Sequence, residues 1–129
     1  MIELARPKTG DKMADLGSGD GRILIAFAKV GVEARGYELD PQLIEKSQNE
    51  IEKENLNDRV FVQIEDFWDV DLSSFDIITI YPMPDIIGIL EEKLRKELHP
   101  TTRVLLNYYS FSTKIPKAIK NNIYLYQFD

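Results

Sequence analysis

The chain has 129 residues, enough for one domain with a buried core, so we predict a single domain over residues 1–129. With 43% hydrophobic and 29% charged residues, no cysteine and no run near the roughly 18 apolar residues of a membrane helix, the sequence excludes disulfides, thiolate metal sites and membrane spans. The formal net charge of −6 argues against nucleic acid as the main partner, because phosphate binding is largely electrostatic.

Residues 12–30 predict a strand, a glycine turn and a helix. The short apolar stretch 12–16 reads as a buried strand, and glycines follow at positions 17, 19 and 21. Glycine allows positive φ and close approach to a ligand. Helical spacing of apolar residues over 23–30 then ends at Gly31, where a helix cap glycine belongs. An ordinary glycine turn in an α/β protein is the alternative.

Asp15 at the strand tip limits what this turn can bind. A carboxylate repels phosphate and attracts an ammonium group. A dinucleotide fingerprint needs a glycine where Arg22 stands, and a P-loop needs Gly-Lys-Ser/Thr, which is absent. The expected ligand is therefore a nucleoside that carries an amino acid.

The second predicted strand, 32–37, ends in Glu38, about 23 residues after Asp15. One carboxylate there supplies two acceptor oxygens for the two hydroxyls of a ribose. A surface acid is the alternative. A helix should start at Asp40-Pro41, with Asp as the N-cap and Pro at the first helical position.

The third predicted strand, 59–64, leads into Glu65, Asp66 and Phe67. The carboxylate of Asp66 can accept a hydrogen bond from an adenine amino group, and the backbone N–H of Phe67 can donate to a ring nitrogen. A loop cap is the alternative role for Asp66. Trp68 fits core closure as well as ligand contact.

The second half of the chain predicts two more buried strands and an edge strand. A nearly continuous apolar run, 75–81, stops at Tyr-Pro-Met-Pro (81–84) and is followed by a helix with its apolar face over 86–98. Residues 103–109 form the fifth strand, tipped by Asn107, Tyr108 and Tyr109. A basic loop, 111–122, precedes a last strand over 122–128.

Strands that alternate with helices predict an α/β fold with a doubly wound, mostly parallel sheet. The glycine motif resembles motif I of class I S-adenosylmethionine-dependent methyltransferases, which share a Rossmann-like fold. Five blocks together make the resemblance closer, to the archaeal broad-specificity protein-lysine methyltransferases and their mitochondrial relatives. These blocks are Asp-Leu-Gly-Ser-Gly-Asp-Gly-Arg-Ile, Gly-Tyr-Glu-Leu-Asp-Pro, the Asp-Phe-Trp loop, Ile-Thr-Ile-Tyr and Lys-Glu-Leu-His-Pro-Thr-Thr-Arg-Val.

The resemblance implies S-adenosyl-L-methionine as cofactor, with Asp15 and the glycine turn at its methionine end, Glu38 at the ribose and Asp66 at the adenine. The full predicted cofactor set is Asp15, Gly17, Ser18, Gly19, Glu38, Leu39, Asp66 and Phe67. Relatives in this family carry longer segments at both ends and a tryptophan near Pro116. The shortened ends are expected to affect cofactor affinity and turnover more than the fold.

The expected reaction is methyl transfer to a lysine of a protein substrate, with no metal required. An apolar channel lowers the lysine pKa so that the neutral amine forms. Tyr81, Asn107 and Tyr108 are the candidate catalytic channel residues, with strand-end packing as the alternative role for Asn107 and Tyr108. A methyltransferase for a small molecule or RNA, or a catalytically silent cofactor-binding subunit, remains an alternative.

Charge and targeting signals bear on partners and location. Residues 38–76 hold about 12 acids against 3 bases, and residues 93–120 hold about 7 bases against 1 acid. Two differently charged solvated faces explain this, and so does an acidic surface that attracts a cationic substrate. The absence of a signal-peptide pattern predicts a cytoplasmic protein without membrane contact. The sequence leaves a homodimer open.

Overall fold

The computed structural model describes residues 1–128, and their strands and helices follow the predicted order. The strands are β1 (Lys12–Leu16), β2 (Glu33–Glu38), β3 (Val60–Ile64), β4 (Ile77–Ile80), β5 (Arg103–Asn107), β6 (Ala118–Lys120) and β7 (Ile123–Tyr126). The α-helices are α1 (Ile2–Ala5), α2 (Arg22–Ala28), α3 (Pro41–Lys53) and α4 (Ile87–Glu97), and the 3₁₀ helices are η1 (Phe67–Asp69) and η2 (Pro84–Ile86).

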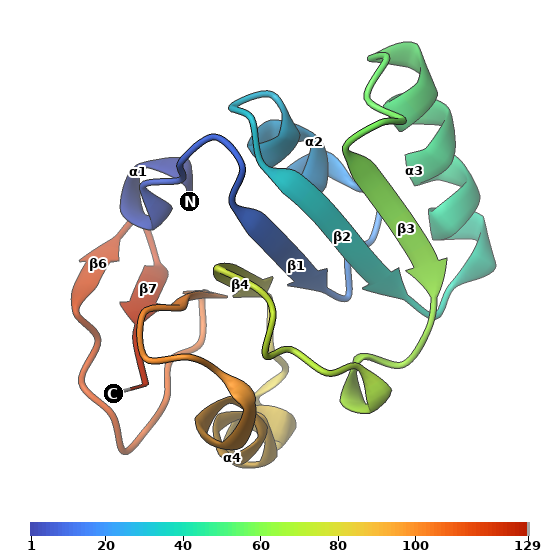
Figure 1. The fold of residues 1–129 in the computed structure, drawn as a ribbon. Helices are drawn as coiled ribbons and strands as arrows, with labels where there is room; N and C mark the ends of the chain where they lie inside the picture. Colours follow the sequence, from blue (N-terminus) through green and yellow to red (C-terminus); the bar gives the residue numbers. More distant parts are fainter. Residues whose placement is uncertain (129) are drawn as a thin grey trace.

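The strands form one seven-stranded sheet in the order β3-β2-β1-β4-β5-β7-β6 (Figure 1). The first five strands in this order are parallel, and β7 and β6 add an antiparallel edge. The order reverses between β1 and β4, which are neighbours in the sheet. In an open α/β sheet the carboxyl ends of the strands at such a reversal form the ligand site. The mostly parallel, doubly wound α/β fold is therefore confirmed.

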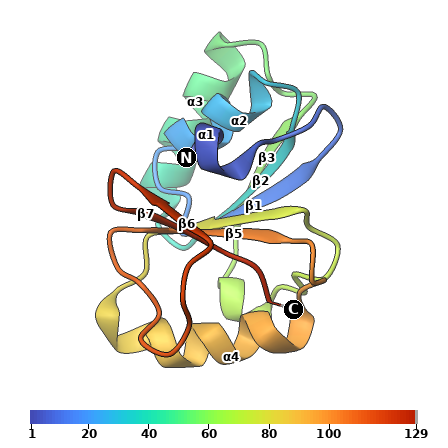
Figure 2. The same ribbon diagram turned by 90° about the vertical axis from the view of Figure 1, so that its left-hand side faces the viewer.

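Helices cover both faces of the sheet, with α1, α2 and α3 on one face and α4 on the other (Figure 2). Each face has its own apolar core. Leu24 and Phe27 of α2 pack with Met13 and Ile77 on the first face. On the second face the buried leucines of α4 (Leu90, Leu94 and Leu98) pack with Ile78, Ile80, Val104 and Leu106. The two cores hold β1 and β4 rigidly, because both strands are buried from both sides.

The predicted helix caps are present and fix the ends of the strands that carry the site. The Asp40 carboxylate accepts a hydrogen bond from the Gln42 N–H at 2.9 Å, and Pro41 is the first residue of α3. Gly31 has φ +92°, and the N–H groups of Gly31 and Val32 donate to the carbonyls of Ala28 and Phe27 beyond the end of α2. This pairing is the Schellman pattern that terminates helices.

Two predictions for the C-terminal part were wrong. The fifth strand ends at Asn107, not Tyr109, because Tyr108 has φ +74° and leaves the sheet. The loop predicted over 111–122 contains β6, which forms a hairpin with β7. Asn121 and Asn122, with φ +50° and +63°, form the two-residue turn of this hairpin. Both residues have positive φ, as a type I′ turn requires, and asparagine adopts that conformation readily.

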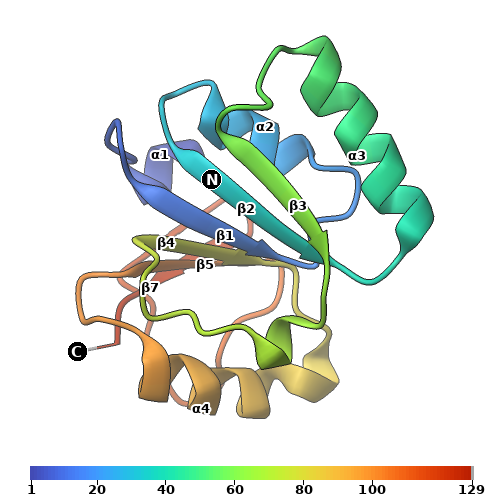
Figure 3. The same ribbon diagram turned by 45° about the vertical axis from the view of Figure 1, so that its right-hand side comes forward.

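The link between β3 and β4 contains η1 in place of an α-helix. As a result the face of β2 and β3 on the α4 side has no helix over it (Figure 3). Residues on that face, among them Arg35, Phe61 and Gln63, are half-buried or exposed. The two ends of the sheet are thus unequal: one is closed by a short hairpin, the other is open.

Candidate active site

The glycine turn between β1 and α2 has the backbone that the sequence predicts. Gly17, Gly19 and Gly21 have φ of +79°, +57° and +84°. A Cβ on Gly17 or Gly19 would have no atom within 4 Å, whereas a Cβ on Gly21 would lie 2.9 Å from Cβ of Ser47. The first two glycines therefore leave open space at the turn. The third permits close packing of α3 against it.

Asp15 is buried at the tip of β1, with 3% of its surface exposed. Its neighbour in the sheet register is Thr79 of β4, whose hydroxyl donates to Oδ1 of Asp15 at 2.8 Å. Burial raises the pKa of Asp15 to about 7, the negative charge of Glu38 raises it further, and the Thr79 hydrogen bond opposes both. Asp15 is therefore poised to ionise when a cation arrives.

Ser18 has a buried hydroxyl without a hydrogen-bond partner among residues 1–128. Tight packing holds it there, since a Cβ on Gly36 of β2 would lie only 2.6 Å from Oγ of Ser18. The N–H groups of Gly17 and Ser18 share the carbonyl of Tyr37 at 2.8 and 3.2 Å, which pins the turn to β2. An orphaned hydroxyl inside a rigid turn is a polar group that an additional ligand or water can satisfy.

A pocket of about 310 Å³ lies beside this turn. It brings together four predicted cofactor residues, Asp15, Gly17, Ser18 and Gly19, with the predicted channel residue Tyr81. Its other lining residues are Asp20, Arg22, Ile23, Leu43 and Lys46. Sequence reasoning missed Leu43 and Lys46 because they come from α3. The small Ser47 within an apolar helical stripe was the available signal, since it is where Gly21 meets α3.

Glu38 braces the turn instead of pointing freely into solvent. Its Oε1 accepts a hydrogen bond from the Gly19 N–H at 2.9 Å, and its Oε2 accepts from the N–H groups of Leu39 and Asp40 at 3.0 Å each. The carboxylate thereby links the glycine turn to the start of α3. Each oxygen still has acceptor capacity for a further donor, because a carboxylate offers about four lone-pair positions.

The predicted adenine-side residues do not line this pocket. Oδ1 of Asp66 caps η1 by accepting from the Trp68 N–H at 3.1 Å, so the alternative role considered for Asp66 is present. Phe67 and Trp68 pack against the α4-side core, with ring centroids 4.7 Å apart. The Leu39 side chain is 61% exposed. These residues follow β2 and β3, so they lie at the carboxyl edge of the sheet next to Glu38.

The candidate channel residues meet at the tips of β4 and β5. The rings of Tyr81 and Tyr108 are parallel within 2°, with centroids 6.4 Å apart, and Tyr109 lies edge-on to both. Tyr81 and Tyr108 remain more than half exposed. Asn107 is half-buried at the end of β5. The three tyrosines form an aromatic surface that begins at the rim of the pocket, where Tyr81 belongs to both.

A strained turn holds Tyr108 in this position. The Tyr109 N–H donates to the Asn107 carbonyl at 2.9 Å, which closes a γ-turn with Tyr108, at φ +74°, in its centre. The Tyr108 N–H donates to the Asn122 carbonyl at 2.7 Å, in the β6–β7 turn. Positive-φ γ-turns are rare, and strain of this kind concentrates at functional sites.

Within the described residues there is no group of three or more His, Cys, Asp or Glu side chains that could hold a metal ion. The helices of the same residues include none long and apolar enough to span a bilayer.

Comparison with known proteins agrees with this geometry. The sequence model of the ANTKMT methyltransferase domain matches residues 15–118, from Asp15 to the start of β6. The chain belongs to this methyltransferase family. Its fold is that of the class I S-adenosylmethionine-dependent methyltransferases, so the resemblance seen in the sequence is confirmed.

Two relatives illustrate the range of the family. The methyltransferase is 35% identical over 119 residues to a lysine N-methyltransferase of Xenopus laevis that is named for a component of ATP synthase, covering 92% of this chain and 52% of that protein. It is 32% identical over 136 residues to a protein-lysine N-methyltransferase of Saccharolobus islandicus, covering 98% of this chain and 84% of that one. The chain spans about half the length of the vertebrate relatives from Xenopus laevis and Homo sapiens.

Among solved structures, an RNA methyltransferase from Salinibacter ruber in complex with S-adenosyl-L-homocysteine superposes with a TM-score of 0.93 at 29% identity. The match covers 98% of this methyltransferase and 86% of that chain. The fold of the two proteins is thus the same almost throughout.

Proposed function

We propose that this chain is an S-adenosylmethionine-dependent protein-lysine N-methyltransferase. The observation that carries the proposal is the buried Asp15 beside a pocket that the glycine turn lines on one side and Tyr81 on the other. A carboxylate ready for an amino-acid ammonium group thus shares one hollow with an aromatic rim suited to an incoming amine. The archaeal relative named as a protein-lysine N-methyltransferase, matched over most of both chains, supports the choice of acceptor.

The residues of the site fit the cofactor chemically. Ionised Asp15 attracts the ammonium group of the methionine part, and the open backbone at Gly17 and Gly19 lets that part approach closely. Glu38 offers acceptor capacity to the ribose hydroxyls while it braces the turn. Oδ2 of Asp66, the oxygen that does not cap η1, is the acceptor proposed for the adenine amino group. Leu39 and Phe67 supply the apolar surface beside it.

The bound cofactor supplies a methyl group made electrophilic by its sulfonium. The work left to the protein is to align the acceptor amine and remove water from it. The faces of Tyr81 and Tyr108 attract a cationic lysine side chain, and the apolar surroundings lower the lysine pKa so that the neutral amine forms. We assign Asn107 a supporting role, as a hydrogen-bond partner of the amine at the end of β5.

A second candidate acceptor is RNA, favoured by the similarity to the RNA methyltransferase from Salinibacter ruber. The net charge of −6 disfavours it. The cytoplasmic location expected from the sequence likewise remains a prediction.

The acceptor is tested by incubating the protein with S-adenosylmethionine and either lysine-rich proteins or structured RNA, followed by mass spectrometry of both. Mass gains of one methyl group or its multiples, mapped to lysine, are expected. Tyr81→Ala should reduce them, whereas Tyr124→Ala, a half-buried tyrosine on β7 outside this cluster, should retain them. Methylation of RNA alone would exchange the first candidate for the second. Cofactor binding with no methylated acceptor of either kind would favour a silent cofactor-binding subunit.

A further inference from the structure

The two edges of the sheet differ in how they are protected against pairing with another strand. At one edge β6 has three residues, and its Lys120 forms an ion pair with Glu3. At the other edge β3 reads Val-Phe-Val-Gln-Ile, five residues without a charge, proline or glycine. Natural edge strands avoid association through shortness, charges or proline. Only β6 has such protection.

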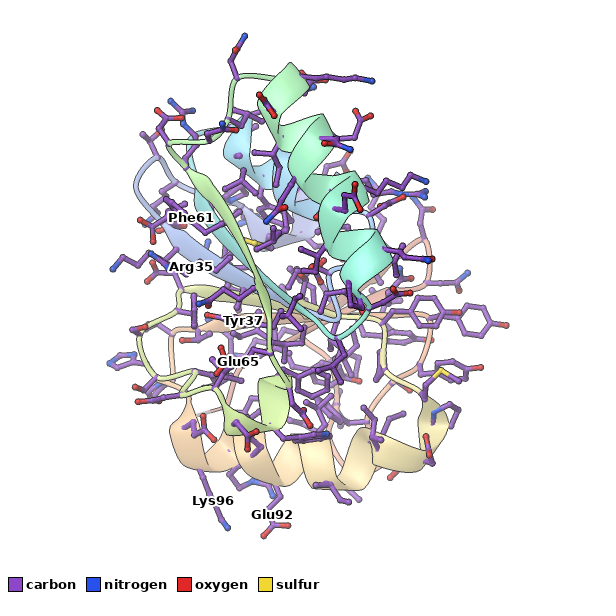
Figure 4. All side chains as sticks on the ribbon, turned by 90° about the vertical axis from the view of Figure 1, so that its right-hand side faces the viewer. Arg35, Tyr37, Phe61, Glu65, Glu92 and Lys96 are labelled. Atoms are coloured by element: carbon purple, nitrogen blue, oxygen red, sulfur yellow. The ribbon has the colours of Figure 1, made fainter. Side chains whose placement is uncertain are left out.

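The β3 edge is also accessible. Ile64 is 59% and Phe61 36% exposed, and a groove of about 510 Å³ runs along the strand. Its walls come from β3 itself and from α3, including Gln48, Ile51 and Glu52. Figure 4, which views the molecule from this edge, shows Phe61 and Arg35 on the face that α3 does not cover. Arg35 stacks over the Phe61 ring at 4.8 Å, which keeps this flat apolar surface in place.

The register of β2 and β3 decides which backbone groups of β3 point outward. The Arg59 carbonyl accepts from the Ala34 N–H at 2.8 Å, and Ala34 is aligned with Val60. In a parallel pair every second residue directs both of its backbone groups to the same neighbour. The even-numbered residues Val60, Val62 and Ile64 therefore present their carbonyls to the open edge, and Val62 and Ile64 also present their N–H groups.

We infer that two copies of this chain associate through their β3 edges, pairing antiparallel around Val62. A two-fold axis through Val62 places Val62 against itself, Val60 against Ile64 and Phe61 against Gln63. The same axis places Arg59 of each copy opposite Glu65 of the other. A two-fold interface must be self-complementary, and this sequence is, in both its apolar pattern and its charges.

Neighbouring registers lack this complementarity. A shift by one residue in each copy places Asp58 opposite Ile64, or Val60 opposite Asp66, and separates Arg59 from Glu65. The paired register uses the outward backbone groups of Val62 and Ile64 and covers the exposed Ile64 side chain. Arg59 retains N–H groups for the partner, since Nη1 is the nitrogen that already donates, to the Ala28 carbonyl at 3.1 Å. The result is a continuous sheet with the two α3 helices side by side.

Sedimentation equilibrium over a dilution series tests the association, and we expect a monomer–dimer equilibrium. Glu65→Arg brings two arginines together at each end of the strand pair and should raise the dissociation constant by about tenfold or more. The exchange variant Arg59→Glu with Glu65→Arg restores opposite charges and should recover most of the loss. Such recovery is specific to the inferred register.

A matched pair of edge variants tests the surface itself. Ile64→Lys adds a charge to the β3 edge at a side chain that is already exposed, and should shift the protein to monomer. Ile119→Lys adds the same charge to an equally exposed isoleucine on the β6 edge and should leave the dimer unchanged. Thermal unfolding confirms that both variants fold. A protein that is monomeric throughout the series overturns the inference, as does a dimer that Ile64→Lys and Glu65→Arg do not weaken.

Discussion

The tips of β1 and β2 and the tips of β4 and β5 solve different problems. At the first pair the backbone is fixed by hydrogen bonds inside the protein: the glycine turn to Tyr37, Glu38 to three N–H groups, Asp15 to Thr79. At the second pair three tyrosines lie largely exposed, and one of them is held by a strained turn. The first region is built to bind one ligand tightly, and the second to admit variable acceptors.

The largest expected effect concerns the ionisation of Asp15. Its pKa rises on folding, from an ordinary value near 3.8 to about 7, so the folded protein binds more protons than the unfolded chain between these values. Stability should therefore decrease as pH increases from about 4 to 7, by at most about 4 kcal/mol from this group. Asp15→Asn should remove this part of the pH dependence in urea unfolding curves. An unchanged slope in the variant would show that Asp15 is not the group responsible.

The next effect separates the packing glycine from the ligand glycine. Gly21→Ala adds a positive-φ side chain and a 2.9 Å contact with Ser47, and should lower the unfolding free energy by about 2–4 kcal/mol. Gly19→Ala meets open space, so its cost in stability should be about 1–2 kcal/mol from φ alone. Cofactor titration of the folded Gly19 variant should nonetheless show weakened binding. Equal stability losses in the two variants would contradict the assignment.

Glu38 should show a mixed effect. Glu38→Ala removes three backbone contacts of the turn along with the proposed ribose acceptor, so both stability and cofactor affinity should fall, each by about 1–3 kcal/mol. Glu33→Ala removes an acid at the opposite end of the same strand and serves as the control, with cofactor affinity retained. Calorimetric titration and thermal unfolding measure the two quantities. Loss of stability with full cofactor affinity would limit Glu38 to bracing the turn.

The smallest effect concerns the turn that positions Tyr108. Asn122→Val should cost about 1–2 kcal/mol because a β-branched residue is strained at φ +63°, and methylation should slow. Asn55→Val imposes a similar strain at φ +57°, at the end of α3, and should leave the rate per folded molecule unchanged. Asn122→Gly suits the turn and should behave like the wild type. A rate loss shared by the Asn55 variant would make the effect one of global stability.

Predictability from the sequence follows the same division. The glycine turn, the caps at Asp40 and Gly31 and the apolar helix faces were predicted because each depends on residues close together in the chain. The γ-turn at Tyr108 was missed because the Asn122 carbonyl, distant in sequence, holds it. The position of Lys46 in the pocket depends on how α3 packs on Gly21. The double role of Glu38 also requires coordinates, since a pattern places its carboxylate but does not show which N–H groups it accepts.

The most direct test of the account is calorimetric titration of S-adenosylmethionine between pH 5.5 and 7, with wild type, Asp15→Asn and Asp20→Asn. Asp20 lines the same pocket, but its hydrogen bonds with Arg22 lower its pKa, so it stays ionised over this range and serves as the control. We predict that wild-type and Asp20→Asn affinity increases with pH as Asp15 ionises, and that Asp15→Asn binds more weakly with no such increase. Wild-type binding that is absent, or that is independent of pH and matched by Asp15→Asn, would contradict the central claim that Asp15 holds the cofactor.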